Sequence, residues 1–226
     1  MDSVFIQQQT KVWSYPRPYE VAKRLFDWVI CLLLLPVLLP VMAVCAVAIR
    51  LDSPGPAFFI QERIGKDGNP FRMFKFRTMQ HNLDDREHRA YMQAFVKGEV
   101  EGKIEEGHTI FKPIKASQIT KVGAILRKTS LDELPQIINV LRGEMSIVGP
   151  RPNVPWEVEA YEPWHYQRLN VLPGITGLAQ VMGRSTISFD DIAHHDVEYV
   201  EDCCLWLDLK ILWLTALSVF SGAGAL

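Results

Sequence analysis

Two adjacent acids, Asp132 and Glu133, stand directly before the apolar run IINVL at 137–141, whose pattern is helical. They could take part in chemistry, or they could only start the helix. The second interpretation is well supported, because Ser130 followed three residues later by Glu133 matches a capping box, and acids in a first turn complement the helix dipole. With Ser130 as the cap, Pro135 would interrupt the helical hydrogen bonds, whereas a cap at Asp132 avoids this. Asp132 would then lie beside amides that favour anions, so the local pattern favours structure and leaves phosphate chemistry open.

Several basic residues stand beside glycines and prolines that form loops. An arginine held between two prolines loses less freedom on binding, and its fork can engage phosphate oxygens in a bidentate way. Each residue alone is well explained as a solvated surface charge. Together with the acid pair and a proline-broken apolar segment, they indicate a substrate with phosphate and lipid parts. The candidates are Lys75, Arg77, Arg127, Lys128, Arg151 and Arg184.

An uncharged apolar segment runs from residue 28 to residue 49. As a helix it would extend about 33 Å, which is enough to cross the hydrocarbon core, so a spanning helix is the default. Pro36 and Pro40, however, lie at its middle, where each removes a backbone hydrogen bond. Both flanks are basic, which favours the cytoplasmic side for both ends. The sequence thus predicts a re-entrant helical hairpin, in preference to a cleavable signal peptide or a buried core helix.

Composition limits the function classes. The 226 residues carry a formal net charge of -2, but residues 1–80 hold ten basic and six acidic side chains, a net of +4. A basic N-terminal third suits a membrane surface or phosphorylated ligands, and the total charge argues against wholesale nucleic-acid binding. The four cysteines form no CxxC pair and have no histidine at zinc-like spacing, which argues against a structural zinc site or a disulfide framework.

The remaining pattern predicts an α+β fold that is mainly helical. Residues 53–79 favour a small β-hairpin that turns at Asp67-Gly68. Residues 81–107 are highly charged and mostly helix-compatible, with residues 98–107 as a solvated excursion. Two short helices follow, separated at Thr129–Ser130 and ended by Gly143. The last helical pattern becomes apolar and Trp-bearing from residue 203, which favours either an interfacial amphipathic helix or core packing. Neither a P-loop nor a Rossmann glycine motif is present.

These segments together resemble a known family. The chain contains, in order, KRLFD, the proline-broken apolar helix, SPGPAFFIQERIG, KFRTM, LRKTSLDELPQIINVLRGEMSIVGPRP, PGITGLAQVMGR and DLKILWLTAL. This succession is similar to that of the bacterial sugar transferases, the monotopic polyprenyl-phosphate phosphoglycosyl transferases. The resemblance begins at Lys23 and leaves the N-terminal arm and residues 81–118 outside it.

The resemblance implies an enzyme that transfers a sugar-1-phosphate from a nucleotide diphosphate sugar, such as a UDP-sugar, to polyprenyl (undecaprenyl) phosphate. The family's catalytic acid pair falls on Asp132 and Glu133, its preceding basic residue on Arg127, its Pro-Arg-Pro motif around Arg151, and its helix-breaking proline on Pro40. The chain departs from the family pattern where Leu39, Leu178 and Met182 stand.

The implied architecture has three parts: an N-terminal arm at 1–22, a re-entrant membrane helix at 23–50 and a cytoplasmic, membrane-associated catalytic domain at 51–226. The implied location is the cytoplasmic face of the bacterial inner membrane, with the lipid bilayer as a partner, no nucleic acid, and a homodimer as a possible assembly.

For the mechanism, Asp132 is expected to attack the phosphate next to the sugar and form an acyl-phosphate. Mg²⁺ shared by Asp132 and phosphate oxygens would screen the two anions. Glu133 would position the metal or handle a proton, and Arg127 and Arg151 would stabilise the moving charge, with Lys75, Arg77 and Arg184 binding phosphate. A glycosidase is disfavoured, because its two carboxylates must flank a sugar from different sides. A membrane-anchored scaffold without catalysis, in which the acids only cap a helix, remains the alternative.

Overall fold

The computed structural model describes residues 17–81, 86–100, 103–105, 108–110, 118–183 and 186–221. Among these, the helices are α2 (Arg17–Asp52), α3 (Arg86–Val96), α4 (Lys121–Lys128), α5 (Ile137–Arg142), α6 (Pro155–Val158), α7 (Leu178–Met182), α8 (Phe189–Asp202) and α9 (Leu205–Ser221). Short 3-10 helices are η1 (Lys66–Gly68), η3 (Leu131–Gln136) and η4 (Pro163–Asn170). The strands are β1 (Phe58–Ile64), β2 (Pro70–Phe76), β3 (Lys103–Glu105), β4 (His108–Ile110), β5 (Ser146–Val148) and β6 (Gly174–Thr176). The prediction of a mainly helical α+β fold is confirmed.

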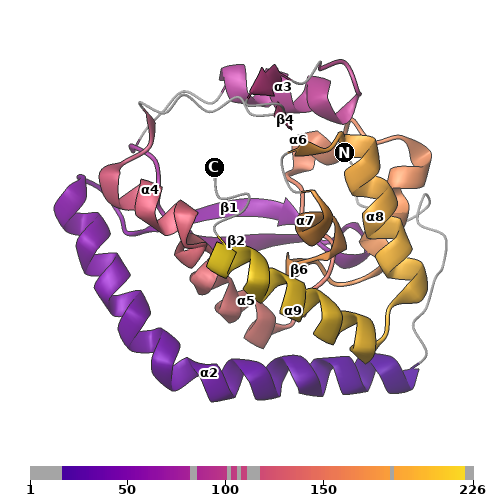
Figure 1. Cartoon of the computed structure of the whole chain (residues 1–226), viewed down its shortest axis with the longest axis horizontal. Helices are drawn as coiled ribbons and strands as arrows, with labels where there is room; N and C mark the ends of the chain where they lie inside the picture. Colours follow the sequence, from indigo (N-terminus) through magenta and orange to yellow (C-terminus); the bar gives the residue numbers. More distant parts are fainter. Residues whose placement is uncertain are drawn as a thin grey trace.

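The apolar segment forms one helix, α2, with Pro36 and Pro40 inside it. Figure 1 shows that α2 bends near its middle, and that its two arms diverge. The bend agrees with the loss of two backbone hydrogen bonds, but the predicted hairpin is corrected to a single bent helix. The helix also extends beyond the predicted limits of 23–50 at both ends. Residues 1–16 of the predicted N-terminal arm lie outside the described residues.

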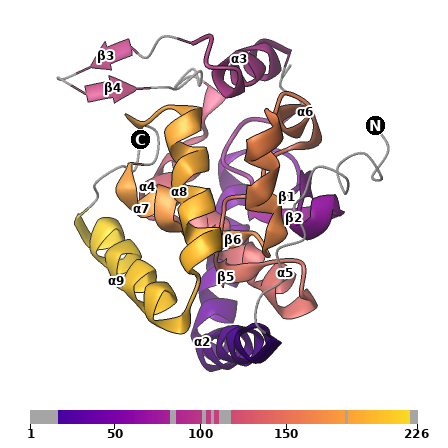
Figure 2. The same cartoon turned by 90° about the vertical axis from the view of Figure 1, so that its right-hand side faces the viewer.

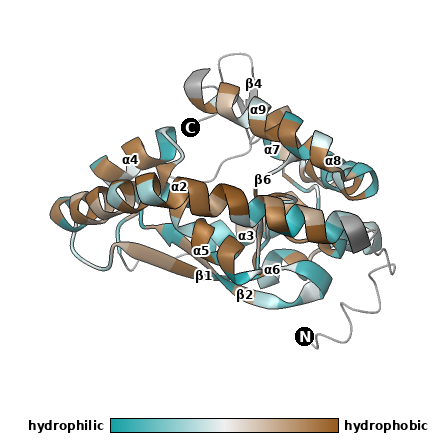
Figure 3. Ribbon diagram, turned by 90° about the horizontal axis from the view of Figure 1, so that it is seen from below, coloured by the Kyte–Doolittle hydropathy of each residue, from teal (hydrophilic) through white to brown (hydrophobic). Residues whose placement is uncertain are grey.

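The outer surface of α2 is strongly apolar. It is the one described helix that is long and apolar enough to cross a membrane, and most of its apolar side chains do not pack against the rest of the protein. Figure 3 shows hydrophobic residues along this helix and along α9. Exposed side chains on α2 include Leu32, Leu33, Val37, Val44, Val47 and Leu51. Such a surface suits lipid better than water, which supports the predicted association with a membrane.

The predicted β-hairpin is confirmed. Strands β1 and β2 pair antiparallel from Phe58↔Phe76 to Ile64↔Pro70. Asp67 and Gly68 turn the chain with positive φ angles of 57° and 77°. Asp and Gly tolerate this left-handed region better than other residues do, which explains why the turn lies there.

The hairpin and α5 pack on α2 through two groups of buried side chains. Cys31 of α2, Met73 of β2 and Val140 of α5 belong to the first group. Met42 and Ile49 of α2 belong to the second, into which Leu131 and Leu134 of η3 also pack. The acid pair therefore lies on a turn that is anchored by its apolar neighbours.

The described parts of residues 81–118 lie at the end of the molecule opposite α2, where Figure 2 shows α3 beside the two-stranded sheet β3–β4. Phe95 and Val96 of α3 join a separate core cluster with Tyr161 and Phe189. Val100, in the stretch 98–107 that the sequence predicts to be solvated, also packs against this cluster, so that part of the stretch contributes to a core.

Helix α9 combines both explanations left open by its sequence. Asp208 and Ile211 are buried at 0% exposure, so one face packs on the protein. The other face exposes Trp206 (77%), Leu209, Trp213 and Leu217. This spacing places the exposed apolar residues on a single side of the helix, which is typical of a helix that lies at a membrane surface.

Candidate active site

The acid pair lies on a tight turn between two helices. Helix α4 ends at Lys128, and Ser130 takes the left-handed conformation with φ 56° before η3 begins. The Ser130 side chain makes no capping hydrogen bond, and the Glu133 amide donates to the Ser130 carbonyl at 3.3 Å. Both capping predictions are therefore wrong: the Ser130–Glu133 box is absent, and Asp132 lies inside the first turn. Pro135 lies inside this short 3-10 turn, where it lacks the amide hydrogen that other residues would donate.

The Glu133 carboxylate is held by two cations. Its Oε1 accepts from Lys75 Nζ at 3.2 Å and from Arg151 Nη1 at 2.9 Å. Burial alone would raise the pKa of Glu133, but the charges and hydrogen bonds of Arg151 and Lys75 outweigh it and lower the pKa to about 2. Glu133 is therefore ionised at neutral pH and committed to ordering its two partners. That leaves it poorly suited to carrying a proton.

Asp132 is partly exposed and differs from its neighbour in having no hydrogen bond or ion pair to any described residue. Burial and the adjacent charge of Glu133 raise its pKa, while Lys75, Arg151 and Arg127 oppose this increase. A carboxylate that lacks a partner within a cationic surrounding can bind a further cation or react with an electrophile. Of the two acids, only Asp132 has this capacity.

The predicted basic residues on either side of the acids are brought together by different elements. Lys75 lies on β2, Arg127 near the end of α4, and Arg151 on the loop after β5. Burial and the charge of Arg151 lower the pKa of Lys75 to about 8. The Arg151 side chain is 45% exposed although it binds Glu133, and its charge also acts on Asp132. This region is a cationic cluster open on one side.

Arg127 is placed by the close approach of α4 to the chain after β2. Its Nε donates to Thr78 Oγ1 at 2.9 Å, and the Thr120 amide donates to the Thr78 carbonyl at 3.1 Å. Gly123 makes this approach possible, because a Cβ there would collide with that carbonyl. Burial lowers the pKa of Arg127, and the charge of Asp132 counteracts this effect.

Arg77, another predicted phosphate-binding residue, is not brought into this cluster. Arg77 is buried, and its guanidinium donates to the carbonyls of Ser53 and Pro54 and to Ser53 Oγ. It anchors the turn between α2 and β1, which is a structural task. Arg184 lies outside the described residues.

The loop that carries Arg151 follows a short parallel strand pair. Ser146↔Gly174 and Val148↔Thr176 are paired, and the Gly149 amide donates to the Thr176 carbonyl at 2.9 Å. The Gly174 amide donates to the Pro150 carbonyl at 2.9 Å, and a Cβ on Gly174 would collide with the backbone of Gly149. The GPRP and PGIT segments therefore form one rigid unit beside the acids.

Sequence reasoning did not single out Asn139, which positions β2. Asn139 is fully buried; its Oδ1 accepts from the Phe74 amide at 3.1 Å, and its Nδ2 donates to the Arg72 carbonyl at 2.7 Å. These bonds surround the strand segment that leads to Lys75. A single amide within the apolar run IINVL was the available signal, since a buried polar side chain needs partners.

A second charged cluster joins α2 to the rest of the protein. Lys23 Nζ lies 3.7 Å from Asp27 and 3.0 Å from Asp208 of α9. Asp27 accepts from Ser146 Oγ at 2.7 Å, and Asp208 accepts from Tyr199 at 2.8 Å. The KRLFD and DLKIL segments, almost two hundred residues apart, thus meet in one buried network (hereafter the anchor network).

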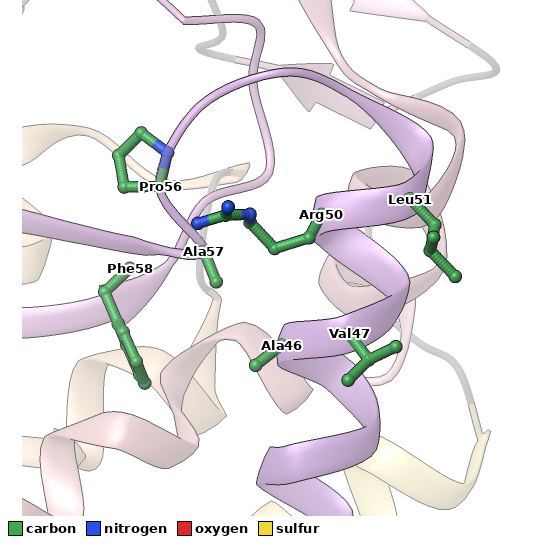
Figure 4. A pocket seen from close by; sticks show the side chains of 7 residues that line it. All are labelled: Ala46, Val47, Arg50, Leu51, Pro56, Ala57 and Phe58. Atoms are coloured by element: carbon green, nitrogen blue, oxygen red, sulfur yellow. The ribbon is translucent and has the colours of Figure 1, made fainter.

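An open pocket of about 490 Å³ lies between the end of α2 and the start of β1. Figure 4 shows Arg50 extending from α2 across to the segment at Pro56 and Ala57, with Ala46, Val47 and Phe58 supplying apolar walls. An apolar hollow with one cation at its rim suits a lipid better than a sugar.

Within the described part of the chain, no three His, Cys, Asp or Glu side chains gather where they could hold a metal ion. Mg²⁺ at a phosphate-transfer site commonly takes one or two protein carboxylates and completes its coordination with substrate phosphates and water. Asp132, which lacks a partner among the described residues, has the donor chemistry for such an ion.

Comparison with known proteins gives a consistent result. Residues 18–222 match the family model "Bacterial sugar transferase", and this match includes the excursion that motif comparison left outside. The chain is 38% identical to the exopolysaccharide production protein ExoY of Sinorhizobium fredii, over 98% of this chain and 94% of that protein. It is 42% identical to the galactosyl transferase CpsE of Streptococcus agalactiae, over 78% of this chain and 37% of that protein.

A third relative is the UDP-glucose:undecaprenyl-phosphate glucose-1-phosphate transferase of Escherichia coli, which is 38% identical over 91% of this chain. The chain spans only 42% of that relative's length. The predicted enzyme class, a phosphoglycosyl transferase, agrees with these names. The acid pair, the surrounding cations, the apolar bent helix and the match over nearly the whole length lead to one conclusion: the chain belongs to the bacterial sugar transferase family.

Proposed function

We propose that this protein transfers a sugar-1-phosphate from a nucleotide diphosphate sugar, a UDP-sugar, to undecaprenyl phosphate, in the first membrane step of bacterial glycan assembly. The single observation that carries the proposal is the unequal state of the two acids. Glu133 is bound by Lys75 and Arg151, whereas Asp132 is left without a partner among the described residues in the same cationic cluster. The activity in the name of the Escherichia coli relative supports the choice of substrates.

In the first step, a carboxylate oxygen of Asp132 attacks the phosphorus next to the sugar. A bond forms between that oxygen and phosphorus, and the phosphoanhydride bond breaks with release of nucleoside monophosphate. In the second step, a phosphate oxygen of undecaprenyl phosphate attacks the phosphosugar group and restores the Asp132 carboxylate. One phosphoanhydride replaces another, so the overall reaction is close to balance and reversible.

The surrounding residues supply charge and order. The Arg151 side chain is half exposed, and its charge acts on Asp132. It would stabilise the negative charge of the transferring phosphoryl group. Arg127, fixed by Thr78, would act from the opposite side of the turn. Glu133 holds Lys75 and Arg151 in place. We assign it this ordering task, since its low pKa makes it a poor proton carrier.

Mg²⁺ bound by Asp132 and substrate phosphate oxygens would reduce the repulsion between the attacking carboxylate and the diphosphate. Lys75, Arg127 and Arg151 would reduce the same repulsion from within the protein, because their charges oppose the increase in the pKa of Asp132 that burial and Glu133 cause.

We further propose that both ends of α2 lie on the cytoplasmic side of the bacterial inner membrane. The matched basic flanks, the bend at the paired prolines and the exposed apolar face of α9 support a protein that enters one leaflet and rests on its surface. The pocket beside Arg50 would accommodate part of a lipid that reaches the site from this leaflet.

The reaction is tested with enzyme, Mg²⁺ and a panel that includes UDP-glucose and UDP-galactose, in the absence of undecaprenyl phosphate. A two-step reaction should release a stoichiometric burst of nucleoside monophosphate and add the mass of a phosphosugar to the peptide that contains Asp132. Asp132→Asn should abolish burst and adduct, while thermal unfolding stays unchanged because Asp132 has no partner to lose. If both substrates are required before any monophosphate appears, and no adduct is trapped, the covalent route is excluded.

The topology is tested by labelling single cysteines introduced at positions 15 and 66 in intact cells. Neither should react with a membrane-impermeant reagent, and both should react after the cells are opened. Replacing both Pro36 and Pro40 by alanine should favour a straight, spanning helix, because the uninterrupted segment is long enough. Labelling of just one position from outside in the unmodified helix would show that α2 spans the membrane.

A further inference from the structure

Arg168 is a buried cation that lies outside both the cationic site cluster and the anchor network. Its side chain lies on η4, is 3% exposed, and forms an ion pair with Asp196 of α8. Its guanidinium carbon also lies over the Phe189 ring, 5.5 Å from the ring centroid. A buried Arg–Asp pair gives little net stability compared with apolar residues of similar size, so its presence calls for another reason.

The remaining bonds of Arg168 lead to the loop that carries Arg151. Its Nη2 donates to the Arg151 carbonyl at 3.2 Å, and its Nη1 donates to Asn153 Oδ1 at 2.8 Å. Nη1 also donates to the Tyr161 hydroxyl at 3.0 Å, a bond that does not involve this loop. One guanidinium therefore joins α8 to the backbone of the residue that faces Asp132.

Three successive carbonyls of this loop each have a separate donor. The Arg151 carbonyl accepts from Arg168, the Pro152 carbonyl accepts from Arg63 Nη1 at 3.0 Å, and the Asn153 carbonyl accepts from the Ile64 amide at 2.9 Å. Arg168 is the donor that acts on the peptide of Arg151 itself. The backbone of the loop is fixed while the Arg151 side chain stays half exposed.

We propose that Arg168, with Asp196 as its counter-ion, is a positioning residue that directs the Arg151 guanidinium toward Glu133 and Asp132. As a statement about catalysis this inference rests on the proposed function, whereas as a statement about the orientation of Arg151 it does not. Small displacements of a charge-stabilising group strongly reduce its effect, so the hydrogen bond from buried Arg168 to the Arg151 carbonyl has a direct consequence for turnover.

The test is Arg168→Lys, which keeps a charge opposite Asp196 but loses the planar fork that reaches both Asp196 and the loop. We expect kcat to fall by about tenfold to a hundredfold, with a smaller change in KM for the nucleotide sugar. Because Arg168 acts through Arg151, the double variant Arg168→Lys/Arg151→Lys should be about as slow as Arg151→Lys alone. Two independent losses that multiply would contradict the proposal.

The matched control is Tyr161→Phe, which removes a partner of the same guanidinium that does not belong to the loop. It should leave kcat unchanged within about twofold. Should Arg168→Lys fail to fold, Asn153→Ala weakens the same link from the loop side without disturbing the Arg168–Asp196 pair. It is expected to lower kcat in the same direction by a smaller factor.

A second measurement does not depend on activity. In ¹⁵N-arginine-labelled protein, the guanidinium signals of Arg151, assigned by their loss in Arg151→Lys, should be resolved because Nη1 is bound to Glu133. They should collapse to an averaged signal in Arg168→Lys. A wild-type enzyme that transfers no sugar phosphate would refute the proposed function and leave this measurement decisive. A folded Arg168→Lys protein with wild-type Arg151 signals would overturn the inference.

Discussion

The protein contains two clusters in which a lysine forms an ion pair with a nearby acid. They differ in whether every carboxylate has a partner within the protein. In the anchor network, Lys23 lies between Asp27 and Asp208. The hydroxyl groups of Ser146 and Tyr199 donate hydrogen bonds to these two carboxylates. All charges there are buried. In the site cluster, Lys75 and Arg151 bind Glu133, while Asp132 has no partner among the described residues and the Arg151 side chain is half exposed.

This difference separates a structural role from a chemical one. A buried charge network in which each charge has partners joins elements and has no remaining capacity for a ligand, whereas removing one member leaves an uncompensated charge. A cluster with one unpaired carboxylate and one open side keeps that capacity for a substrate. The residue types are nearly the same, so exposure and the count of partners decide the role.

The largest effect on stability is expected from a substitution that breaks the anchor network. Lys23→Met leaves Asp27 and Asp208 buried without their cation, which should lower the free energy of unfolding by about 3–5 kcal/mol. Thermal unfolding in detergent measures this. Turnover per folded molecule should stay near normal.

Lys66→Met is the control for this prediction. It removes a solvent-accessible ion pair with Glu20, which lies on α2 like Lys23. Its cost should be about 1 kcal/mol or less. Equal losses from both substitutions would show that burial does not distinguish the anchor network.

The next effect is expected in the site cluster. Arg151→Lys keeps the charge near Glu133 but loses the fork that matches phosphate geometry, so turnover should fall by about tenfold to a hundredfold. The melting temperature should change little because the side chain is half exposed. A well-folded variant with near-normal turnover would remove Arg151 from the site.

The smallest effect concerns pH. Burial and the charge of Arg151 lower the pKa of Lys75 to about 8, so above this pH Lys75 loses its proton and releases Glu133. Turnover should therefore decline on the alkaline side near pH 8. In Lys75→Arg the cation stays protonated, and this decline should move to higher pH in a pH–rate profile. An unchanged alkaline limb would mean that another group sets it.

The acidic side tests Glu133 through stability. Its pKa is about 2 in the folded protein and higher in the unfolded chain, so its ion pairs stabilise the fold above the unfolded pKa. This contribution should be lost as the pH falls from about 4.5 toward 2. Glu133→Gln should show a smaller loss of stability over the same pH range in acid unfolding curves.

The sequence by itself determined the features that depend on neighbouring residues. The Asp67-Gly68 turn, the end of α5 at Gly143, and the bend of α2 at its prolines follow from local backbone preferences, which act without the rest of the chain. The order of motifs was sufficient to indicate the family. It also drew attention to Asp132, Glu133, Arg127 and Arg151.

Only the tertiary structure decided how the side chains share their partners. The sequence offered helix capping for Ser130 and Glu133, but packing of β2 and the Arg151 loop gave Glu133 two cations, which outweigh a local cap. It also gave Arg77 to the carbonyls of Ser53 and Pro54. These contacts join residues 18 to 58 positions apart, and a one-dimensional pattern contains no information on distance, burial or competing partners at that range.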